Sequence, residues 1–383
     1  MSEDRIPLAV PCLEGNTLRY LQECVETNFV SSVGPFVDRF ESEFAAHVGS
    51  PHAVACANGT AALHVALCVA GVGPGDEVIV SDFTFVATVN PIAYVGASPV
   101  LADSDWKTWN IDPDLIVEEL DGRARAGRRM PKAVLVAHVL GLPVDIAPIA
   151  AACDRHGVAL IEDAAEALGA RYSGGGLGGK QVGTVGVLGC YSFNGNKIIT
   201  SGGGGMITTT DASIARRAKH LTTQAKLPGA EYFHDTIGFN YRMPNLNAAL
   251  GVAQLEMLDD FIQRKLEIAT RYDDALADMP GITLPPRPSW STPSMWLYSI
   301  LIDSAIARRD RKVVHKLLAS EGIDTRPVWA PAHMMPFYAG ARRLGGAVAE
   351  TLFERGLSLP CSVTLGRAEQ DRVIGALRTV IGR

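Results

Sequence analysis

The sequence Val158-Ala159-Leu160-Ile161-Glu162-Asp163 is a short apolar run that ends in two acidic residues. A run of this length and composition predicts a buried β-strand. Strands are predicted in the same way at residues 52–57, 77–80, 99–102 and 132–138. Helices are predicted at residues 60–70, 146–156 and 211–221. This alternation indicates an α/β fold with a mainly parallel sheet covered on both faces, whose sites lie beyond the carboxyl ends of the strands.

The length of 383 residues, with 47% apolar and 20% charged residues, indicates a globular protein of about two domains. A helical stretch over residues 245–279 ends at Pro280-Gly281 and reads as a connector. We therefore expect a large domain over residues 1–255 and a smaller C-terminal α+β domain over residues 256–383. The smaller domain is expected to contain a strand at 296–302, a helix at 311–321 and a final helix from residue 368.

The charge and the apolar pattern exclude several classes of partner. A net charge of -6 provides no basic stripe, so nucleic acid and anionic membranes are poor partners. No apolar run is long enough to span a bilayer, and residues 1–5 lack the apolar segment of a signal peptide, so we expect a cytoplasmic protein. Seven scattered cysteines without a CxxC pair predict neither a disulfide framework nor a metal site.

Lys197 stands in Tyr191-Ser192-Phe193-Asn194-Gly195-Asn196-Lys197-Ile198, just before four consecutive glycines. Small and apolar neighbours indicate a tight, partly buried loop, whereas a lysine chosen at random is a surface residue. A pyridoxal phosphate enzyme needs such an amine to condense with the cofactor aldehyde, and a carboxylate to keep the pyridine nitrogen protonated. Asp163 can supply that carboxylate, although an aspartate before an alanine-rich segment can also be a helix cap.

Two further segments have the composition expected around such a cofactor. Asn58-Gly59-Thr60 joins a strand to a helix, so free amides and the helix dipole could bind a phosphate there, with the hydroxyl of Ser192 beside them. Phe85 follows the strand at 77–80 and could stack on a flat ring, although phenylalanine is more often a core residue. No GxGxxG follows the first strand, which weighs against a nicotinamide dehydrogenase.

Five segments taken together resemble, in order, the signature of the nucleotide-sugar aminotransferases of the DegT/StrS type. They are Asn58-Gly59-Thr60-Ala61-Ala62-Leu63, Thr84-Phe85-Val86-Ala87-Thr88, Glu162-Asp163-Ala164-Ala165-Glu166, Ser192-Phe193-Asn194-Gly195-Asn196-Lys197 and Gly238-Phe239-Asn240-Tyr241-Arg242. The resemblance implies the aspartate-aminotransferase-like fold (pyridoxal phosphate fold type I), a homodimer with shared active sites, and amino transfer from L-glutamate to a nucleotide-linked keto-sugar. The chain is most similar to the branch that aminates UDP-4-keto-6-deoxy-N-acetylglucosamine for bacillosamine or legionaminic acid synthesis; GDP-perosamine synthase is the nearest alternative.

The resemblance also implies roles for individual residues. Lys197 would be the Schiff-base lysine, Asp163 the partner of the pyridinium, and Phe85 the stacking ring. The residues implied for the phosphate are Gly59, Thr60, Ser192 and, from the partner subunit, Asn240. Glu166 replaces a glutamine that many members place near the ring hydroxyl.

Sugar-nucleotide contacts are implied in the C-terminal part at Arg326 and His333. His138 either lines the sugar pocket or is a core histidine. Some relatives of this fold replace the lysine by histidine and act as dehydrases, and others have been linked to regulation. The presence of Lys197 favours transamination over dehydration, and a regulatory protein would not need Asp163, Ser192 and Lys197 all intact.

Overall fold

The structure of the chain is a computed structural model that describes residues 5–229 and 231–382. Residues 1–4, where part of the signal-peptide expectation falls, lie outside the described residues, as does the last position of the expected C-terminal domain. The main sheet has eight described strands, in the spatial order β1 (His52–Cys56), β8 (Gly205–Thr209), β7 (Leu188–Ser192), β5 (Ala159–Asp163), β4 (Ala133–Ala137), β2 (Glu77–Ser81), β3 (Ser98–Ala102) and β13 (Arg342–Leu344).

Neighbouring strands run parallel from β7 across to β13, whereas β8 is antiparallel to both β1 and β7. The register pairs Asp163 with Ala137 on one side and with Cys190 on the other. The carboxyl ends of β4, β5 and β7 therefore lie side by side. This arrangement confirms the α/β architecture with a mainly parallel sheet.

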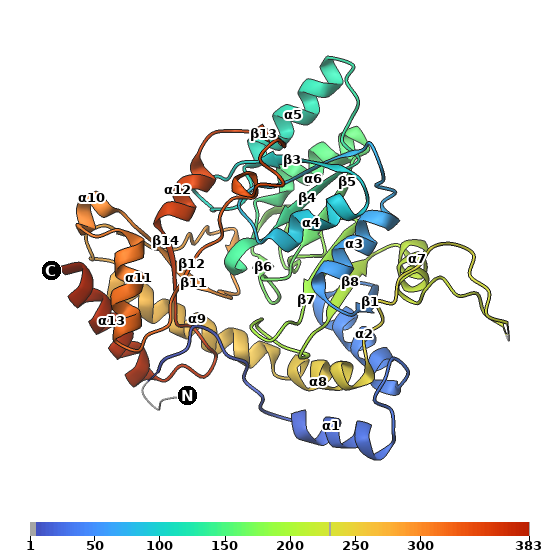
Figure 1. The fold of residues 1–383 in the computed structure, drawn as a ribbon, viewed down its shortest axis with the longest axis horizontal. Coiled ribbons are helices and arrows are strands. Elements are labelled where there is room, and N and C mark those ends of the chain that lie inside the picture. Colours follow the sequence, from blue (N-terminus) through green and yellow to red (C-terminus); the bar gives the residue numbers. More distant parts are fainter. Residues whose placement is uncertain (1–4, 230, 383) are drawn as a thin grey trace.

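Both faces of the main sheet are buried, as expected of parallel strands covered by crossover helices. In β4, Val134 and Val136 belong to one apolar cluster and Ala133 and Leu135 to another, so successive side chains point to opposite faces. The helices on the first face are α2 (Pro35–Val48), α5 (Pro113–Arg125), α6 (Ile146–His156) and α8 (Asn245–Leu255). Those on the second are α3 (Gly59–Val69), α4 (Val86–Tyr94) and α7 (Ala212–Thr222) (Figure 1).

The C-terminal part contains a second, antiparallel sheet on the left of Figure 1. Its strand order is β12 (Arg326–Pro327), β14 (Gly356–Leu359), β11 (Tyr298–Ile302) and β9 (Ile282–Thr283). Helices of the same part are α10 (Ser304–Ala307), α11 (Arg311–Ser320), α12 (Val348–Arg355) and α13 (Arg367–Gly382). The mixture of strands and helices agrees with an α+β unit.

Segments from the two sides of residue 255 are interleaved. Strand β13 pairs with β3 of the main sheet, and β10 (Ser291–Thr292) pairs with β6 (Arg171–Tyr172). Near the amino terminus, Ile6 forms a parallel bridge with Ile323. The division into domains at residue 255 stays a prediction, and any such division must allow for these crossings.

The helical stretch predicted over 245–279 is found as two helices, α8 and α9 (Leu258–Leu276), with a break between them that was not predicted. Glu256, at the break, accepts hydrogen bonds from Tyr20 and Asn16, both at 2.6 Å. These partners lie in and just before α1 (Thr17–Glu26), which packs against α8. The break is therefore formed by tertiary contacts with a distant segment, which helical periodicity does not report.

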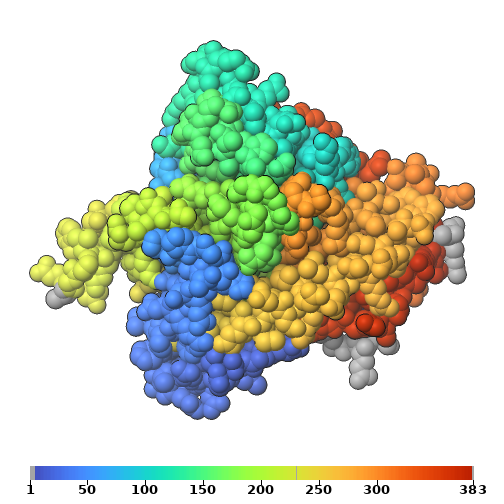
Figure 2. Space-filling model, turned by 180° about the vertical axis from the view of Figure 1, so that it is seen from behind, coloured from blue at the N-terminus to red at the C-terminus, as the bar shows by residue number. Residues whose placement is uncertain are grey.

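The segment between α7 and α8 extends away from the body of the molecule, as the yellow-green part of Figures 1 and 2 shows. Its described residues include two apolar side chains that are almost fully exposed, Tyr232 at 86% and Ile237 at 85%. Asn240, near the end of the segment, is also exposed. Exposed apolar groups on a protruding segment are typical of a surface that meets another protein chain.

Candidate active site

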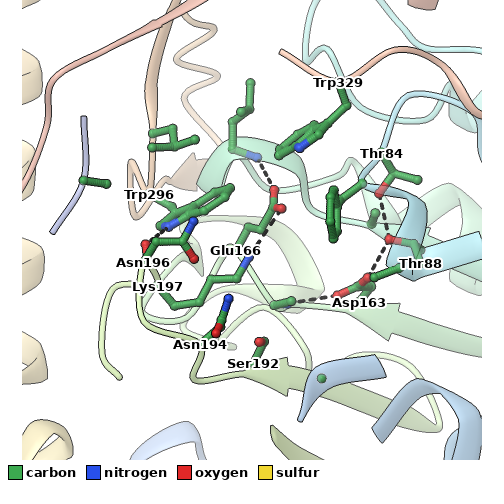
Figure 3. Close-up of a pocket in the computed structure, with 18 of the residues that line it drawn as sticks. Thr84, Thr88, Asp163, Glu166, Ser192, Asn194, Asn196, Lys197, Trp296 and Trp329 are labelled. Carbon is green, nitrogen blue, oxygen red and sulfur yellow. Dashed lines mark hydrogen bonds and ion pairs between the residues drawn. The ribbon is translucent and has the colours of Figure 1, made fainter. Parts of the chain in front are cut away.

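A cavity of about 710 Å³ opens at the carboxyl ends of β4, β5 and β7 and is closed on its other side by the C-terminal part. Its size is ordinary for a small-molecule site. The predicted residues that line it are Gly59, Thr60, Phe85, His138, Asp163, Glu166, Ser192, Lys197 and Arg326. Figure 3 labels Asp163, Glu166, Ser192 and Lys197 among them. The sequence motifs thus converge on one space.

Asp163 is the last residue of β5 and is almost fully buried at the cavity wall. The hydroxyl of Thr88 donates to its Oδ2 at 2.7 Å, and the amide of Ala165 donates to its Oδ1 at 3.0 Å. Burial raises the pKa of Asp163, while these hydrogen bonds and the nearby Lys197 oppose the rise. A buried carboxylate of this kind is stabilised by a cation in the cavity, and a pyridinium is such a cation.

Lys197 lies in the loop between β7 and β8, with its side chain mostly buried. Its Nζ is 3.5 Å from Oε1 of Glu166 and 3.9 Å from the ring centroid of Trp296. The amine therefore sits between a carboxylate and an aromatic face, inside the cavity that Asp163 also borders.

Glu166 has one fixed partner besides Lys197. The amide of Leu140 donates to its Oε2 at 2.9 Å. Leu140 has φ 60, a left-handed conformation that is unusual for a branched residue and that directs this amide to the carboxylate. Burial raises the pKa of Glu166 to about 7, with Lys197 opposing the rise and Asp163 adding to it.

Trp296 was not predicted as a site residue. Its indole Nε1 donates to the carbonyl of Asn196 at 2.6 Å, and its ring is parallel to Trp329 with centroids 6.1 Å apart. Both tryptophans line the cavity from the C-terminal part. The sequence showed only a tryptophan at the start of a predicted strand, and no spacing rule links that strand to Lys197.

The start of α3 has the shape of an anion site. Asn58 caps the helix by accepting from the amide of Ala61 at 2.8 Å, which leaves the preceding amides of Gly59 and Thr60 without an acceptor inside the helix. A Cβ added at Gly59 would come within 2.8 Å of the Cβ of Ser192. Only glycine lets the two segments approach so closely, with the Ser192 hydroxyl beside the amides.

Phe85 begins α4 and lines the cavity with half of its surface exposed, at 50%. An aromatic ring left this open at a cavity wall can cover a flat ligand. A buried acid, an enclosed amine, an anion cradle (the amides of Gly59 and Thr60 with the hydroxyl of Ser192) and an exposed aromatic ring therefore surround one space. These groups fit pyridoxal phosphate, which carries a basic ring nitrogen, an aldehyde and a phosphate.

His138 has no ring nitrogen left for a sugar. Its Nε2 is 3.1 Å from Oε2 of the buried Glu162, and its Nδ1 accepts from the amide of Val144 at 3.0 Å. The ring is buried, although the residue borders the cavity. Of the two alternatives for His138, the structure supports the core histidine and gives no support to sugar binding.

His333 lies outside the residues that line the cavity. Its Nδ1 is 2.5 Å from Asp82 and its Nε2 is 3.0 Å from Glu350, so both nitrogens are paired. This arrangement joins η3 (Ala332–Met334) to β2 and α12, and within this chain it does not support a contact with substrate. Arg326, by contrast, lines the cavity with an exposed side chain.

The described residues contain neither a membrane-spanning helix nor a cluster of metal ligands. None of the described helices has the length and hydropathy needed to cross a membrane. Within residues 5–229 and 231–382, no three His, Cys, Asp or Glu side chains are grouped so that they could hold a metal ion.

Comparison with known proteins places nearly the whole chain in one family. The model of the DegT/DnrJ/EryC1/StrS aminotransferase family matches residues 11–378. The chain is 40% identical over 378 residues to the GDP-perosamine synthase of Caulobacter vibrioides, covering 98% of each protein. It is 38% identical over 364 residues to the GDP-perosamine synthase of Escherichia coli O157:H7, covering 95% of each.

Solved structures agree with this placement. A DegT DnrJ EryC1 StrS aminotransferase from Brucella abortus superposes with a TM-score of 0.88 at 31% identity, covering 96% of each chain. DesV of S. venezuelae, solved with a ketimine intermediate, gives 0.87 at 31% identity, covering 99% of each. This chain therefore belongs to the DegT/DnrJ/EryC1/StrS aminotransferase family and is a pyridoxal phosphate-dependent sugar aminotransferase of fold type I, the aspartate-aminotransferase-like fold.

Proposed function

We propose that the enzyme transfers the amino group of L-glutamate to the C-4 ketone of a 4-keto-6-deoxy sugar linked to a nucleoside diphosphate. The observation that carries the proposal is the placing of Lys197 and Asp163 on the wall of one cavity that also contains an anion cradle. An amine and an acid at separate positions around a flat cofactor are what transamination needs. A surface lysine or a capping aspartate would not share such a cavity.

The roles of the residues follow from their positions. Bound pyridoxal phosphate supplies an aldehyde and a ring that accepts electrons from the substrate carbon. Lys197 holds the aldehyde at rest and, once released, moves a proton to or from the reacting carbon. Asp163 keeps the ring nitrogen protonated, and Phe85 covers the ring. Ser192, together with the amides at the start of α3, binds the phosphate.

The GDP-linked sugar is the preferred substrate in this proposal. The two relatives reported above that have a named product are both GDP-perosamine synthases, and the similarity to them extends over nearly the full chain. The UDP-linked N-acetylglucosamine derivative remains the second candidate, because the opening segment Asn28-Phe29-Val30-Ser31-Ser32-Val33-Gly34 and residues 192–197 resemble that branch. Arg326 is the cavity guanidinium that we expect to contact the diphosphate of either substrate.

We further propose that the active enzyme is a homodimer. The protruding segment after α7 carries exposed Tyr232 and Ile237, which a second copy of the chain would cover. Asn240 is exposed and does not line the cavity of its own chain, so it is available to complete the phosphate site of a partner subunit.

The substrate proposal is tested by incubating the purified protein with glutamate and a panel of GDP-, UDP- and dTDP-linked 4-keto-6-deoxy sugars, with mass measurement of the products. We expect the aminated product to form fastest from the GDP-linked sugar. Fastest turnover of the UDP-linked N-acetyl sugar would select the second candidate, and no aminated product from any of them would overturn the proposal.

A further inference from the structure

The amine of Lys197 contacts two side chains that line the cavity, those of Glu166 and Trp296 (Figure 3). Glu166 Oε1 lies 3.5 Å from Nζ, and the face of Trp296 lies 3.9 Å from it. A carboxylate attracts an ammonium directly, and the electron-rich face of an indole does so through its quadrupole.

The two side chains that contact the Lys197 amine are each held by a further hydrogen bond. On the carboxylate side, Oε2 of Glu166 is occupied by the amide of Leu140, so Oε1 is the oxygen turned to the lysine. On the aromatic side, the hydrogen bond from Nε1 to the carbonyl of Asn196 ties Trp296 to the residue before Lys197. The position of the amine is thus fixed by groups on both sides of it.

The substitution pattern of the cofactor ring places the same carboxyl group beside its hydroxyl. With Lys197 at the aldehyde and Asp163 at the ring nitrogen, the ring carbon that bears the aldehyde has two ring neighbours, one carrying the phosphate arm and one the hydroxyl. Ser192 marks the side of the phosphate arm, and Glu166 lies on the other side of Lys197 in Figure 3. Glu166 therefore faces either the free lysine or the ring hydroxyl, depending on the state of the lysine.

We propose that Glu166 stores a proton for Lys197. When the lysine is free, its ammonium lies between the Glu166 carboxylate and Trp296. When the lysine must attack, one N–H bond of the ammonium breaks and one O–H bond forms on Glu166, giving a neutral amine and a neutral carboxylic acid. Protonated Glu166 could then donate a hydrogen bond to the ring hydroxyl oxygen of bound cofactor. The proton would return from Glu166 to Lys197 when the lysine is released.

The electrostatics of Glu166 agree with this exchange. A carboxyl group whose burial raises its pKa to about 7 is readily found in either protonation state near neutral pH. The charged groups that face it are Lys197, from the loop after β7, and Asp163, from the end of β5. The inference rests on Lys197 being the lysine of the cofactor, as proposed above, and is independent of which sugar is aminated.

The test uses the full-length enzyme in its pyridoxamine phosphate form, where the lysine is free. Infrared difference spectra over a pH series, with Glu166→Gln as the subtraction control, isolate the carboxyl signal of Glu166. We expect its titration midpoint near 7. In Lys197→Ala the midpoint should rise by about one pH unit or more, because the opposite charge that favoured the carboxylate is gone.

A midpoint near the ordinary value of 4.5, or one that does not move in Lys197→Ala, would overturn the proposal. Glu166→Gln adds a kinetic readout: the inflection near pH 7 in the pH profile of kcat should disappear in this variant, and its persistence would contradict the proton store. The sugar panel tests which substrate is aminated, whereas the titration tests whether Glu166 stores a proton. A negative result in one experiment therefore does not decide the other.

Trp296 is tested with its stacking neighbour as a matched control. In a Trp296→Leu background, the shift caused by Lys197→Ala should shrink, because the ammonium is no longer held against Glu166. In a Trp329→Phe background, the shift should keep its size, since Trp329 stacks on Trp296 and the lysine lies over the other ring. An undiminished shift in Trp296→Leu would remove Trp296 from the proposal.

Discussion

Two glutamates four residues apart, Glu162 and Glu166, lie in different environments. Glu162 is fully buried and accepts from four donors, which are the amides of Gly183, Val185 and Gly186 and the ring of His138. Burial works to raise the pKa of Glu162, yet His138 and the backbone amides hold it below its usual value. Glu166 has one backbone donor and one mobile lysine, and burial raises its pKa to about 7.

The difference teaches what separates a structural carboxylate from a reactive one. Burial opposes ionisation at both positions, and more strongly at the fully enclosed Glu162, yet the pKa is lowered there and raised at Glu166, so the number of fixed donors outweighs burial. The lowered pKa of Glu162 favours its ionised form, and its hydrogen bonds tie the loop at residues 183–186 to the sheet. The partner of Glu166, Lys197, moves away from it during each half-reaction in our proposal, so a proton can pass between the two groups. Asp163, between them, belongs with Glu166 because its side chain also meets the cavity.

The largest expected effect is that of Lys197→Ala, which removes the mobile partner from the Glu166 pocket. We expect no turnover above background and no visible absorbance from cofactor bound through the lysine, because the amine is needed both to hold the aldehyde and to move the proton. Steady-state assays and an absorbance spectrum of the purified variant measure this. Lys180→Ala, at an exposed lysine outside the cavity, is the control and should behave as the wild type.

Asp163→Asn should lower kcat by about 10²–10⁴-fold, since a neutral amide of the same shape does not keep the ring nitrogen protonated. Thr88 can still donate to the remaining oxygen, so we expect the thermal midpoint to stay close to that of the wild type. Stopped-flow measurement of the half-reaction with glutamate isolates the step. Turnover near the wild-type rate would move Asp163 from the reactive to the structural class.

Glu162→Gln should act on stability. Its new NH₂ group would face donors where one carboxylate oxygen accepts, so two of the four donors would lose their acceptor and the charge that pairs with His138 would be gone. Breaking such a buried pair costs about 3 kcal/mol or more of unfolding free energy. Urea unfolding of wild type and variant at neutral pH measures the loss, and an unchanged midpoint would contradict the assignment of Glu162 to the scaffold.

Glu166→Gln should have the smallest effect, visible as a change in pH dependence. The group ionises at 4.5 when unfolded and at about 7 when folded, so between these values the folded state keeps a proton that the unfolded state has lost. Stability from this group therefore falls as pH rises through that window, by up to about 1.4 kcal/mol per pH unit, and levels off above 7. Unfolding curves of the cofactor-free variant should lack this slope; the same slope in both proteins would contradict the raised pKa.

The groups at the strand ends could be predicted because parallel strands bring them to one edge. Asp163 closes β5, Ser192 closes β7, and Gly59 follows β1, so their positions in the sheet imply their proximity. The fold class followed from the same alternation of strands and helices. The implied roles of these residues came from the resemblance to the family.

The wall provided by the C-terminal part could not be predicted from the sequence. Trp296 and Trp329 reach the cavity only because a separate antiparallel sheet packs against the first, and nothing local in their segments records that packing. The sequence could not decide between the two alternatives for His138, the sugar pocket and the core, for a related reason. Its partner Glu162 precedes Asp163 on the same strand, and alternation turns those two side chains to opposite faces, so the neighbour of the histidine depends on the register of β4 against β5.

The most direct test of the central claim is to reduce the resting enzyme with borohydride, which converts the carbon–nitrogen double bond between lysine and cofactor into a stable single bond. Peptide sequencing by mass then locates the lysine that carries the cofactor. The account predicts the label on Lys197 alone. A label on another lysine, such as the buried Lys265 that donates to the carbonyl of Cys361, or cofactor lost entirely after reduction, would contradict it.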